Sequence, residues 1–194
     1  MNLAERFETA FINRYASMRH GFADEDWQQA WRDGSWERLM LWNHECLLER
    51  VAHDLGLEYW SREPFRVDAA FVPKQNTPLG SVPFPLLVAI EHENKIATIK
   101  NEIAKLVHIR CLLKVAITYA SNKNLKRSTE KIKQHIIELT ATLNAHIRED
   151  PRSSYLFLVG VVGEGAHRCE LEWHGLRFAA GDGPDLPSWR ALVR

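Results

Sequence analysis

Two glutamates close an apolar run in the middle of the chain. The run 87–90 leads directly into Glu91-His92-Glu93. A short continuous apolar run of this kind predicts a strand buried on both faces of a sheet. Because residues two apart on a strand project to the same face, we expect Glu91 and Glu93 side by side and His92 on the opposite face. Two such carboxylates repel each other unless a cation, a proton or a basic side chain lies between them.

A third carboxylate, Asp68, is the natural partner of this pair. It stands in RVDAAF between Val67 and Ala69, within an expected strand, where an unpaired acid is unfavourable. A hard divalent ion such as Mg²⁺ prefers carboxylate oxygens, so the three acids predict a metal pocket at a sheet edge. The alternative is an ion-pair cluster in which Lys or Arg neighbours neutralise the acids. The spacing does not separate the two interpretations.

Helices are expected first along the chain, and then an alternation of strands and helices. Apolar residues at helical spacing predict helices over 2–18, 22–34, 36–56, 94–113 and 128–147. Short apolar or alternating runs predict strands within 57–72 and over 85–93, 114–120 and 153–163. A terminal hairpin is expected over 167–180, turning at His174-Gly175, followed by a loosely packed tail.

This order predicts an α/β fold with a mixed central β-sheet flanked by α-helices. The length of 194 residues suits one domain. Within it we expect an N-terminal helical extension over 1–34, a core over 35–180 and a tail over 181–194.

The acids and the strands around them resemble the PD-(D/E)xK nuclease superfamily. The matching positions are Asp68, Glu91 and Glu93, in RVDAAF and VAIEHEN, and the αβββαβ core would run from about Trp36 to Tyr119. Two departures are visible: no proline directly precedes Asp68, and Glu93 occupies the position that usually holds lysine. The resemblance implies a restriction-endonuclease-like core and metal-assisted hydrolysis of phosphodiester bonds.

The resemblance also implies a role for each residue of the site. Asp68 and Glu91 would hold Mg²⁺, or Mn²⁺ as a substitute, with the carbonyl of His92 as a further ligand. Glu93 would bind metal or help to deprotonate the attacking water. The missing positive charge would come from Lys95 or Lys105. From the first core helix the resemblance implies a metal-binding glutamate, Glu45 in preference to Glu49, which we expect on a solvated face.

A basic segment lies next to these acids, although the net charge of the chain is zero. Between Lys95 and His135 there are ten Lys or Arg residues against two acids, Glu102 and Glu130, a local balance of +8. Such a segment can present a positive face to nucleic acid, or it can simply solvate two helices. The residues expected to contact phosphates are Lys105, Lys123, Lys126, Arg127, Lys131 and Lys133. Glu102 and Lys105 are expected to form a surface ion pair.

Composition narrows the remaining possibilities. The longest apolar runs, 84–90 and 155–162, are too short to span a bilayer, and the N-terminus lacks a secretory pattern, so we expect a cytoplasmic protein with no membrane partner. Cys46, Cys111 and Cys169 have no metal-site spacing and are expected as reduced core thiols. A DNA nuclease, possible as a homodimer, is our first hypothesis. A catalytically inactive binding module of the same fold is the second, and a phosphohydrolase of small substrates the third.

Overall fold

The described part of the chain contains seven strands and, between residues 3 and 107, six helical segments. The structure is a computed structural model, and it describes residues 1–61, 66–74, 86–121, 130–131, 134, 138, 153–162, 171–179 and 189–193. The helices are α1 (Leu3–His20), α2 (Asp24–Arg32), α3 (Ser35–Glu37), the π-helix η1 (Arg38–Trp42), α4 (Leu47–Asp54) and α5 (Ile99–Val107). The strands are β1 (Leu57–Ser61), β2 (Ala69–Pro73), β3 (Val88–Glu93), β4 (Leu113–Ser121), β5 (Ser154–Val162), β6 (Leu171–Ala179) and β7 (Arg190–Val193).

The seven strands form one mixed sheet in the order of the sequence, β1 to β7. Neighbouring strands are antiparallel from β1 to β3, parallel from β3 to β5, and antiparallel again from β5 to β7. Helix α5 makes the crossover between the parallel strands β3 and β4, as parallel pairing requires. The predicted α/β class and mixed sheet are therefore confirmed.

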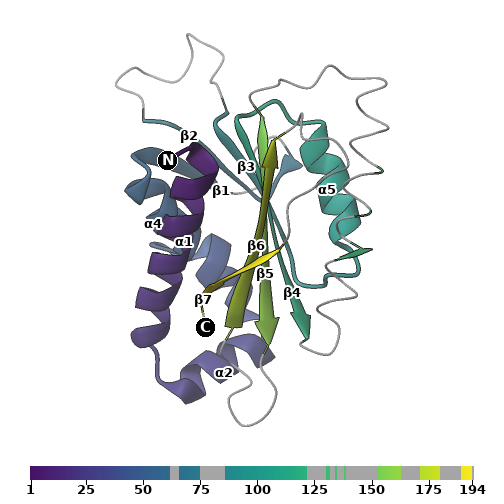
Figure 1. Ribbon diagram of the computed structural model, residues 1–194. Helices are drawn as coiled ribbons and strands as arrows, with labels where there is room; N and C mark the ends of the chain where they lie inside the picture. Colours follow the sequence, from purple (N-terminus) through teal and green to yellow (C-terminus); the bar gives the residue numbers. More distant parts are fainter. Residues whose placement is uncertain are drawn as a thin grey trace.

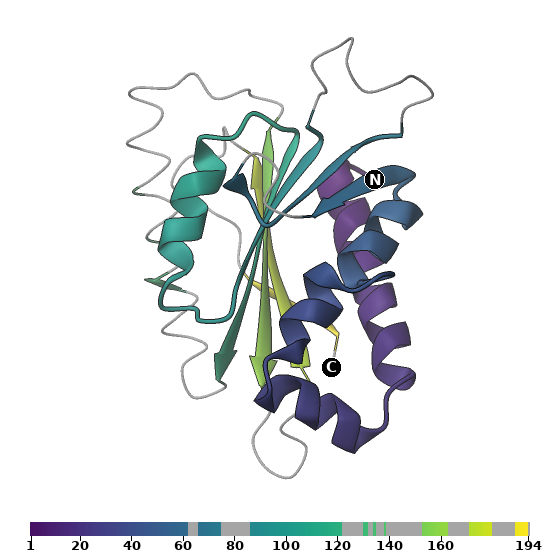
Figure 2. The ribbon, with the colours of Figure 1, turned by 180° about the vertical axis from the view of Figure 1, so that it is seen from behind.

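Helices cover both faces of the sheet. Figures 1 and 2 show α1 and α4 on one side of the strands and α5 on the other. Helix α1 begins with a capping box between Asn2 and Glu5 and ends at Gly21, and its apolar stripe is buried. The predicted extension 1–34 is thus helical, and α1 belongs to the core of the protein.

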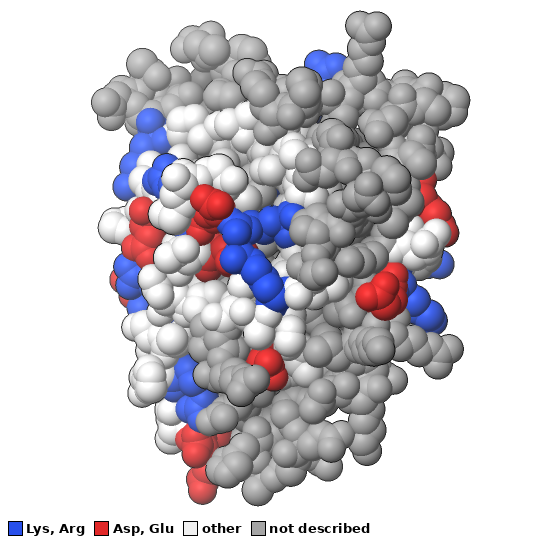
Figure 3. Space-filling model, in the orientation of Figure 1, with Lys and Arg blue, Asp and Glu red and all other residues white. Residues whose placement is uncertain are grey.

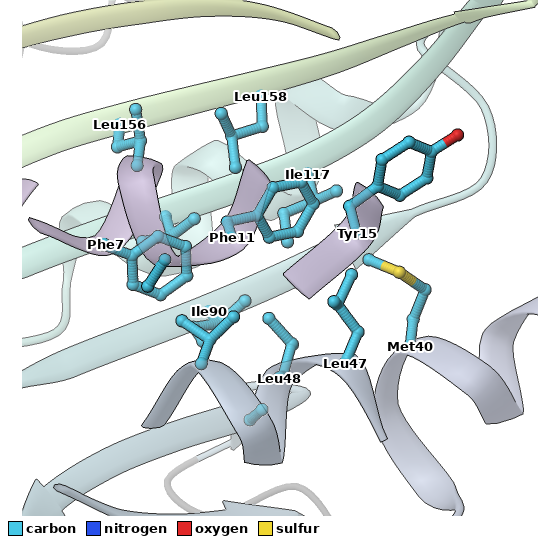
Figure 4. Close-up of a cluster of buried hydrophobic side chains, with 14 of the residues drawn as sticks. Phe7, Phe11, Tyr15, Met40, Leu47, Leu48, Ile90, Ile117, Leu156 and Leu158 are labelled. Carbon is cyan, nitrogen blue, oxygen red and sulfur yellow. The ribbon is translucent and has the colours of Figure 1, made fainter. Parts of the chain in front are cut away.

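Each face of the sheet carries its own hydrophobic cluster. In the α1-side cluster, Phe7 and Phe11 of α1 lie over alternate residues of the central strands, as Figure 4 shows. These strand residues are Ile90, Ile117, Leu156 and Leu158. In the α5-side cluster, Ile99, Ile103 and Leu106 of α5 pack over the intervening residues. Successive residues of β3 therefore enter different environments, which places Glu91 on the α5 side and His92 on the α1 side.

Three element predictions were wrong. The expected helix 36–56 is broken at residues 43–46, between η1 and α4. His174-Gly175 is no turn: both residues lie within β6, which pairs with β5 from Leu171 to Ala179. The C-terminal hairpin is therefore replaced by β5, β6 and β7, and Arg190–Val193 of the predicted loose tail is the edge strand of the sheet.

Some expectations fall largely or wholly outside the described residues. Of the predicted helix 128–147 only Glu130, Lys131, Gln134 and Glu138 are described, and all four are helical and exposed. Cys46 and Cys111 are free and buried, as predicted, whereas Cys169 lies outside the description. Within the described ranges, no helix has both the length and the apolar character needed to cross a membrane.

Candidate functional site

The antiparallel pairing of β2 and β3 brings Asp68 next to Glu91. Ala69 pairs with Ile90, so Asp68, which directly precedes β2, stands opposite Glu91 at the end of the ladder. The backbone N–H of His92 donates a hydrogen bond of 2.7 Å to Oδ2 of Asp68. This bond fixes one oxygen of the Asp68 carboxylate against β3. The predicted pairing of these two acids is thus present in the structure.

Helix α5 adds a lysine and a further acid to this pair. Nζ of Lys105 lies 2.9 Å from Oε1 of Glu91 and also contacts Oε2 of Glu102. The Glu91 side chain is fully buried, whereas 44% of the Lys105 side chain is exposed. Lys105 therefore lies between the buried carboxylate and the solvent. The predicted pair of Glu102 and Lys105 exists, but it is part of the carboxylate site.

One ammonium group is too little charge for three carboxylates. Burial raises the pKa of Glu91 to about 9; the contact with Lys105 opposes this shift, and the charge of Asp68 adds to it. Burial also raises the pKa of Asp68, against the effect of the His92 N–H. Burial lowers the pKa of Lys105, but Glu102 and Glu91 outweigh it and the net shift is upward. The site therefore attracts a proton or a further cation.

The side chain of His92 projects to the α1 side, as the sequence predicts. Its Nε2 lies 2.8 Å from the hydroxyl oxygen of Tyr119, which also accepts a hydrogen bond of 2.6 Å from Nε1 of Trp36. Burial lowers the pKa of His92 to about 4, so the imidazole is neutral at physiological pH. His92 thus ties the backbone that holds Asp68 to the core behind the sheet. A metal-binding role of its carbonyl stays a prediction.

Glu93 and Lys95 are engaged with each other. The backbone N–H of Lys95 donates a hydrogen bond of 3.0 Å to Oε1 of Glu93. Glu93 is only partly buried, and Lys95 is exposed. Of the two lysines considered for the missing positive charge, Lys105 is the one whose ammonium group contacts Glu91. Catalytic roles of Glu93 and Lys95 remain predictions.

Glu45 lies apart from the carboxylates around Lys105. It stands in the turn before α4 with a positive φ of 57°, and its Oε2 accepts a hydrogen bond of 2.9 Å from Nη2 of Arg50. It lines a surface pocket that also includes Arg14, His44, Glu49, Arg50 and His53. Because α4 covers the α1 side of the sheet and Glu91 faces α5, the structure does not place Glu45 with the predicted metal ligands.

The carboxylates suit a hard divalent cation in their chemistry. Both oxygens of Glu91 are buried without a hydrogen bond of good geometry from any described residue, despite the close contact with Lys105. Carboxylate oxygens of this kind are the ligands that Mg²⁺ prefers. Among the residues described, however, no three His, Cys, Asp or Glu are arranged as a group that could hold a metal ion. By the chemistry of their oxygens, Asp68 and Glu91 are two candidate ligands. The Lys105 ammonium lies beside Glu91.

The basic segment is only partly described. Lys131 is helical and exposed. The other four residues of the group lie outside the described residues: Lys123, Lys126, Arg127 and Lys133. Lys114 is buried in the core, where its Nζ donates to the hydroxyl of Tyr155 at 3.1 Å. Lys105 is committed to Glu91 and Glu102. Of the ten basic residues counted in this segment, Lys114 is therefore buried and Lys105 is paired with two acids, which the residue count did not reveal.

Comparison of the chain with protein-family models, with curated proteins and with solved structures finds no match.

Proposed function

We propose that this protein is a metal-dependent nuclease that hydrolyses phosphodiester bonds in DNA. The observation that carries the proposal is the contact between Lys105 and Glu91, with Asp68 held beside them by the His92 N–H. Two acids at neighbouring strand ends and one ammonium group form the set of charges that metal-assisted phosphodiester hydrolysis uses. In this proposal Lys105 of α5 supplies the positive charge that a lysine at position 93 would otherwise provide, so Glu93 at that position is compatible with activity.

The order of the elements supports a restriction-endonuclease-like core. The run α4, β1, β2, β3, α5, β4 follows the αβββαβ order that the resemblance implies, with β3 and β4 parallel. The candidate acids lie where β2 begins and where β3 ends, next to the crossover helix. This position at strand ends beside a helix is a common one for sites in α/β proteins.

Each residue has a defined task in this proposal. Asp68 and Glu91 would hold Mg²⁺, which when bound supplies a Lewis acid for the phosphate and activates water. The half-exposed Lys105 ammonium would meet a phosphate arriving from solvent and offset the negative charge that develops on it. Glu102 would keep Lys105 in position. The His92 N–H would orient Asp68.

Binding of DNA would be local, because the chain as a whole is neutral. On the face drawn in Figure 3, most of the described Lys and Arg side chains lie close to Asp or Glu. The exposed Lys131 and the predicted contacts at Lys123, Lys126, Arg127 and Lys133 would have to supply the positive face for phosphates. A homodimer and a cytoplasmic location remain part of the proposal.

A non-catalytic module of the same fold is the second candidate. The observation that favours it is again the ion pair of Lys105 with Glu91, since a lysine can neutralise an acid without any metal. The three carboxylates outnumber the one ammonium, and for this reason we place the nuclease first. Binding of DNA without cleavage in any metal would reverse this order.

Nicking of supercoiled plasmid tests the proposal. The wild-type protein would be incubated with EDTA, Mg²⁺ or Mn²⁺, beside Asp68→Asn, Glu91→Gln and the matched control Glu45→Gln. The proposal predicts nicking that requires metal, that both site variants lose and that Glu45→Gln keeps. Nicking that survives in Asp68→Asn or Glu91→Gln would refute the assignment of the site.

A further inference from the structure

Thr118 is a buried polar residue to which neither the sequence nor the proposed mechanism assigns a role. It lies in β4 with 2% of its surface exposed. Its Oγ1 has no hydrogen-bond partner among the described residues. A buried hydroxyl without a partner weakens folding, and valine, with the same shape, would fill this position without that cost. Stability alone therefore does not account for a hydroxyl group at position 118.

The pairing of β3 with β4 places this hydroxyl beside the carboxylate site. Thr118 is in register with Glu93, and Ala116 is in register with Glu91. In a parallel pair, residues in register share a face, so Thr118 faces α5 as Glu91 and Glu93 do. It is the diagonal neighbour of Glu91, and the residue directly beside Glu91 on β4 carries only a methyl group.

The carboxylate of Glu91 is only partly satisfied by its neighbours. Its Oε1 has the Lys105 ammonium at 2.9 Å, and its Oε2 is buried without a hydrogen-bond partner among the described residues. A carboxylate can only accept hydrogen bonds when ionised, whereas a threonine hydroxyl can both donate and accept. A divalent cation with its water satisfies both kinds of group, since it takes oxygen ligands and its waters donate hydrogen bonds.

We infer that the Thr118 hydroxyl is a further binding residue of this site, for a hard divalent cation or for a water bound to it. The inference rests on the proposed function, because it assigns Thr118 to the same metal. It adds to the acids a neutral oxygen from β4, the strand that continues after the crossover helix. It also gives the buried hydroxyl its missing partner in the loaded protein.

Calorimetric titration with Mn²⁺ tests the inference on the full chain, with Thr118→Val and Thr118→Ser beside the wild type. Thr118→Val keeps the shape and removes the oxygen, and Thr118→Ser keeps the oxygen. We expect Thr118→Val to weaken Mn²⁺ binding roughly tenfold or more, in the range seen when groups around a metal are removed. We expect Thr118→Ser to bind within about threefold of wild type, and the metal-free melting temperature of Thr118→Val to be equal or higher.

The outcomes separate this inference from the proposed function. Equal Mn²⁺ binding by the wild type and Thr118→Val would overturn the role of Thr118 and leave the metal site in place. A clear drop in the metal-free melting temperature of Thr118→Val would also overturn it, because the hydroxyl would then have a structural partner. A wild-type protein that binds no Mn²⁺ would overturn the proposed function and the role of Thr118 together.

Discussion

At the scale of single residues, Lys105 is the cation that balances part of the negative charge of the site. It lies in α5, fourteen positions after Glu91 by the numbering, yet its Nζ is 2.9 Å from the Glu91 carboxylate. The spacing in the sequence predicted that Lys105 pairs with Glu102. It did not predict that α5 would direct this pair toward Glu91. The orientation follows from Ile99, Ile103 and Leu106, which are buried against the sheet and leave Glu102 and Lys105 at the side of α5 that borders Glu91.

The first prediction concerns the removal of this ammonium group. Lys105→Met should reduce metal-dependent cleavage by roughly 100- to 1,000-fold, as loss of one group that stabilises transition-state charge does. It should not weaken Mn²⁺ binding, because it removes a cation that competes for Glu91. Cleavage rates and Mn²⁺ titrations would check this, with Lys100→Met, an exposed lysine of the same helix, as the control. Cleavage at the wild-type rate would rule out the role of Lys105.

The second prediction concerns the pH dependence of stability without metal. The pKa of Glu91 in the folded protein, about 9, lies above its ordinary value of 4.5. The folded state therefore holds a proton that the unfolded chain releases between these values. The contribution of Glu91 to the free energy of unfolding is thus present below about pH 4.5 and is lost as the pH rises to about 9.

Glu91→Gln should remove this dependence, since glutamine does not titrate. Urea denaturation across this pH range would show a flatter stability curve for the variant than for the wild type. The remaining slope would include Asp68, whose pKa is also raised. Parallel curves for the two proteins would show that Glu91 is ionised throughout, and that Lys105 alone compensates its charge.

At the scale of elements, apolar runs predicted the central strands well, whereas the turn expected at His174-Gly175 is absent. The runs over 85–93, 114–120 and 153–163 correspond to β3, β4 and β5. Glycine in His174-Gly175 suggested a turn, but Gly175 sits inside β6. A Cβ on Gly175 would lie 3.0 Å from Cδ1 of Leu192, so this glycine permits the close approach of β7.

The break in the expected helix 36–56 falls on the polar residues 43–45 and Cys46. Met40 and Leu47 on either side of it are at helical spacing, so spacing alone predicts an unbroken helix. In the structure, Arg50 donates a hydrogen bond of 2.8 Å to the carbonyl oxygen of Glu45, whose φ is positive. The break lets η1 and α4 both pack on the sheet. The positive φ of Glu45 is a local departure from helical geometry that hydrophobic periodicity does not predict.

The third prediction belongs to the contact between β4 and β5. Gly160 is in register with Tyr119, and a Cβ at Gly160 would lie 2.9 Å from Cδ1 of that ring. Gly160→Ala should therefore displace Tyr119, which contacts His92, and destabilise the protein by about 1–3 kcal/mol. Denaturation midpoints would check this, with Gly21→Ala at the end of α1 as a matched control. Equal effects of the two substitutions would contradict the packing argument.

At the scale of the whole molecule, α1 is joined to the far end of the sheet by charges. Glu8 is a buried acid of α1 whose carboxylate contacts Arg190 of β7 and lies 3.5 Å from Arg177 of β6. These contacts connect residues near the two ends of the chain. They add a charged contact to the pairing of β7 with β6, an edge strand that its turn-rich surroundings in the sequence did not suggest.

The fourth prediction is that Glu8→Gln destabilises the protein by about 1–3 kcal/mol, because it removes the buried acid between two arginines. Arg190 would then lose its contact with Glu8, and Arg177 would keep only its ion pair with Glu5. Burial lowers the pKa of Arg177, and the charge of Arg190 lowers it further, which shows the same repulsion. Urea denaturation would measure the loss, with Glu25→Gln on the exposed surface of α2 as the control. Stability equal to that of the control would show that packing alone holds β7.

The most direct test of the central claim is the melting temperature of the wild type and Glu91→Gln at about pH 8, in EDTA and in excess Mg²⁺ or Mn²⁺. A cation that binds only the folded state raises the melting temperature by mass action. The site as described predicts a metal-dependent rise in the wild type that Glu91→Gln loses, together with a metal-free melting temperature of Glu91→Gln at or above that of the wild type. No rise in the wild type, or the same rise in both proteins, would contradict the assignment of a metal to Asp68 and Glu91.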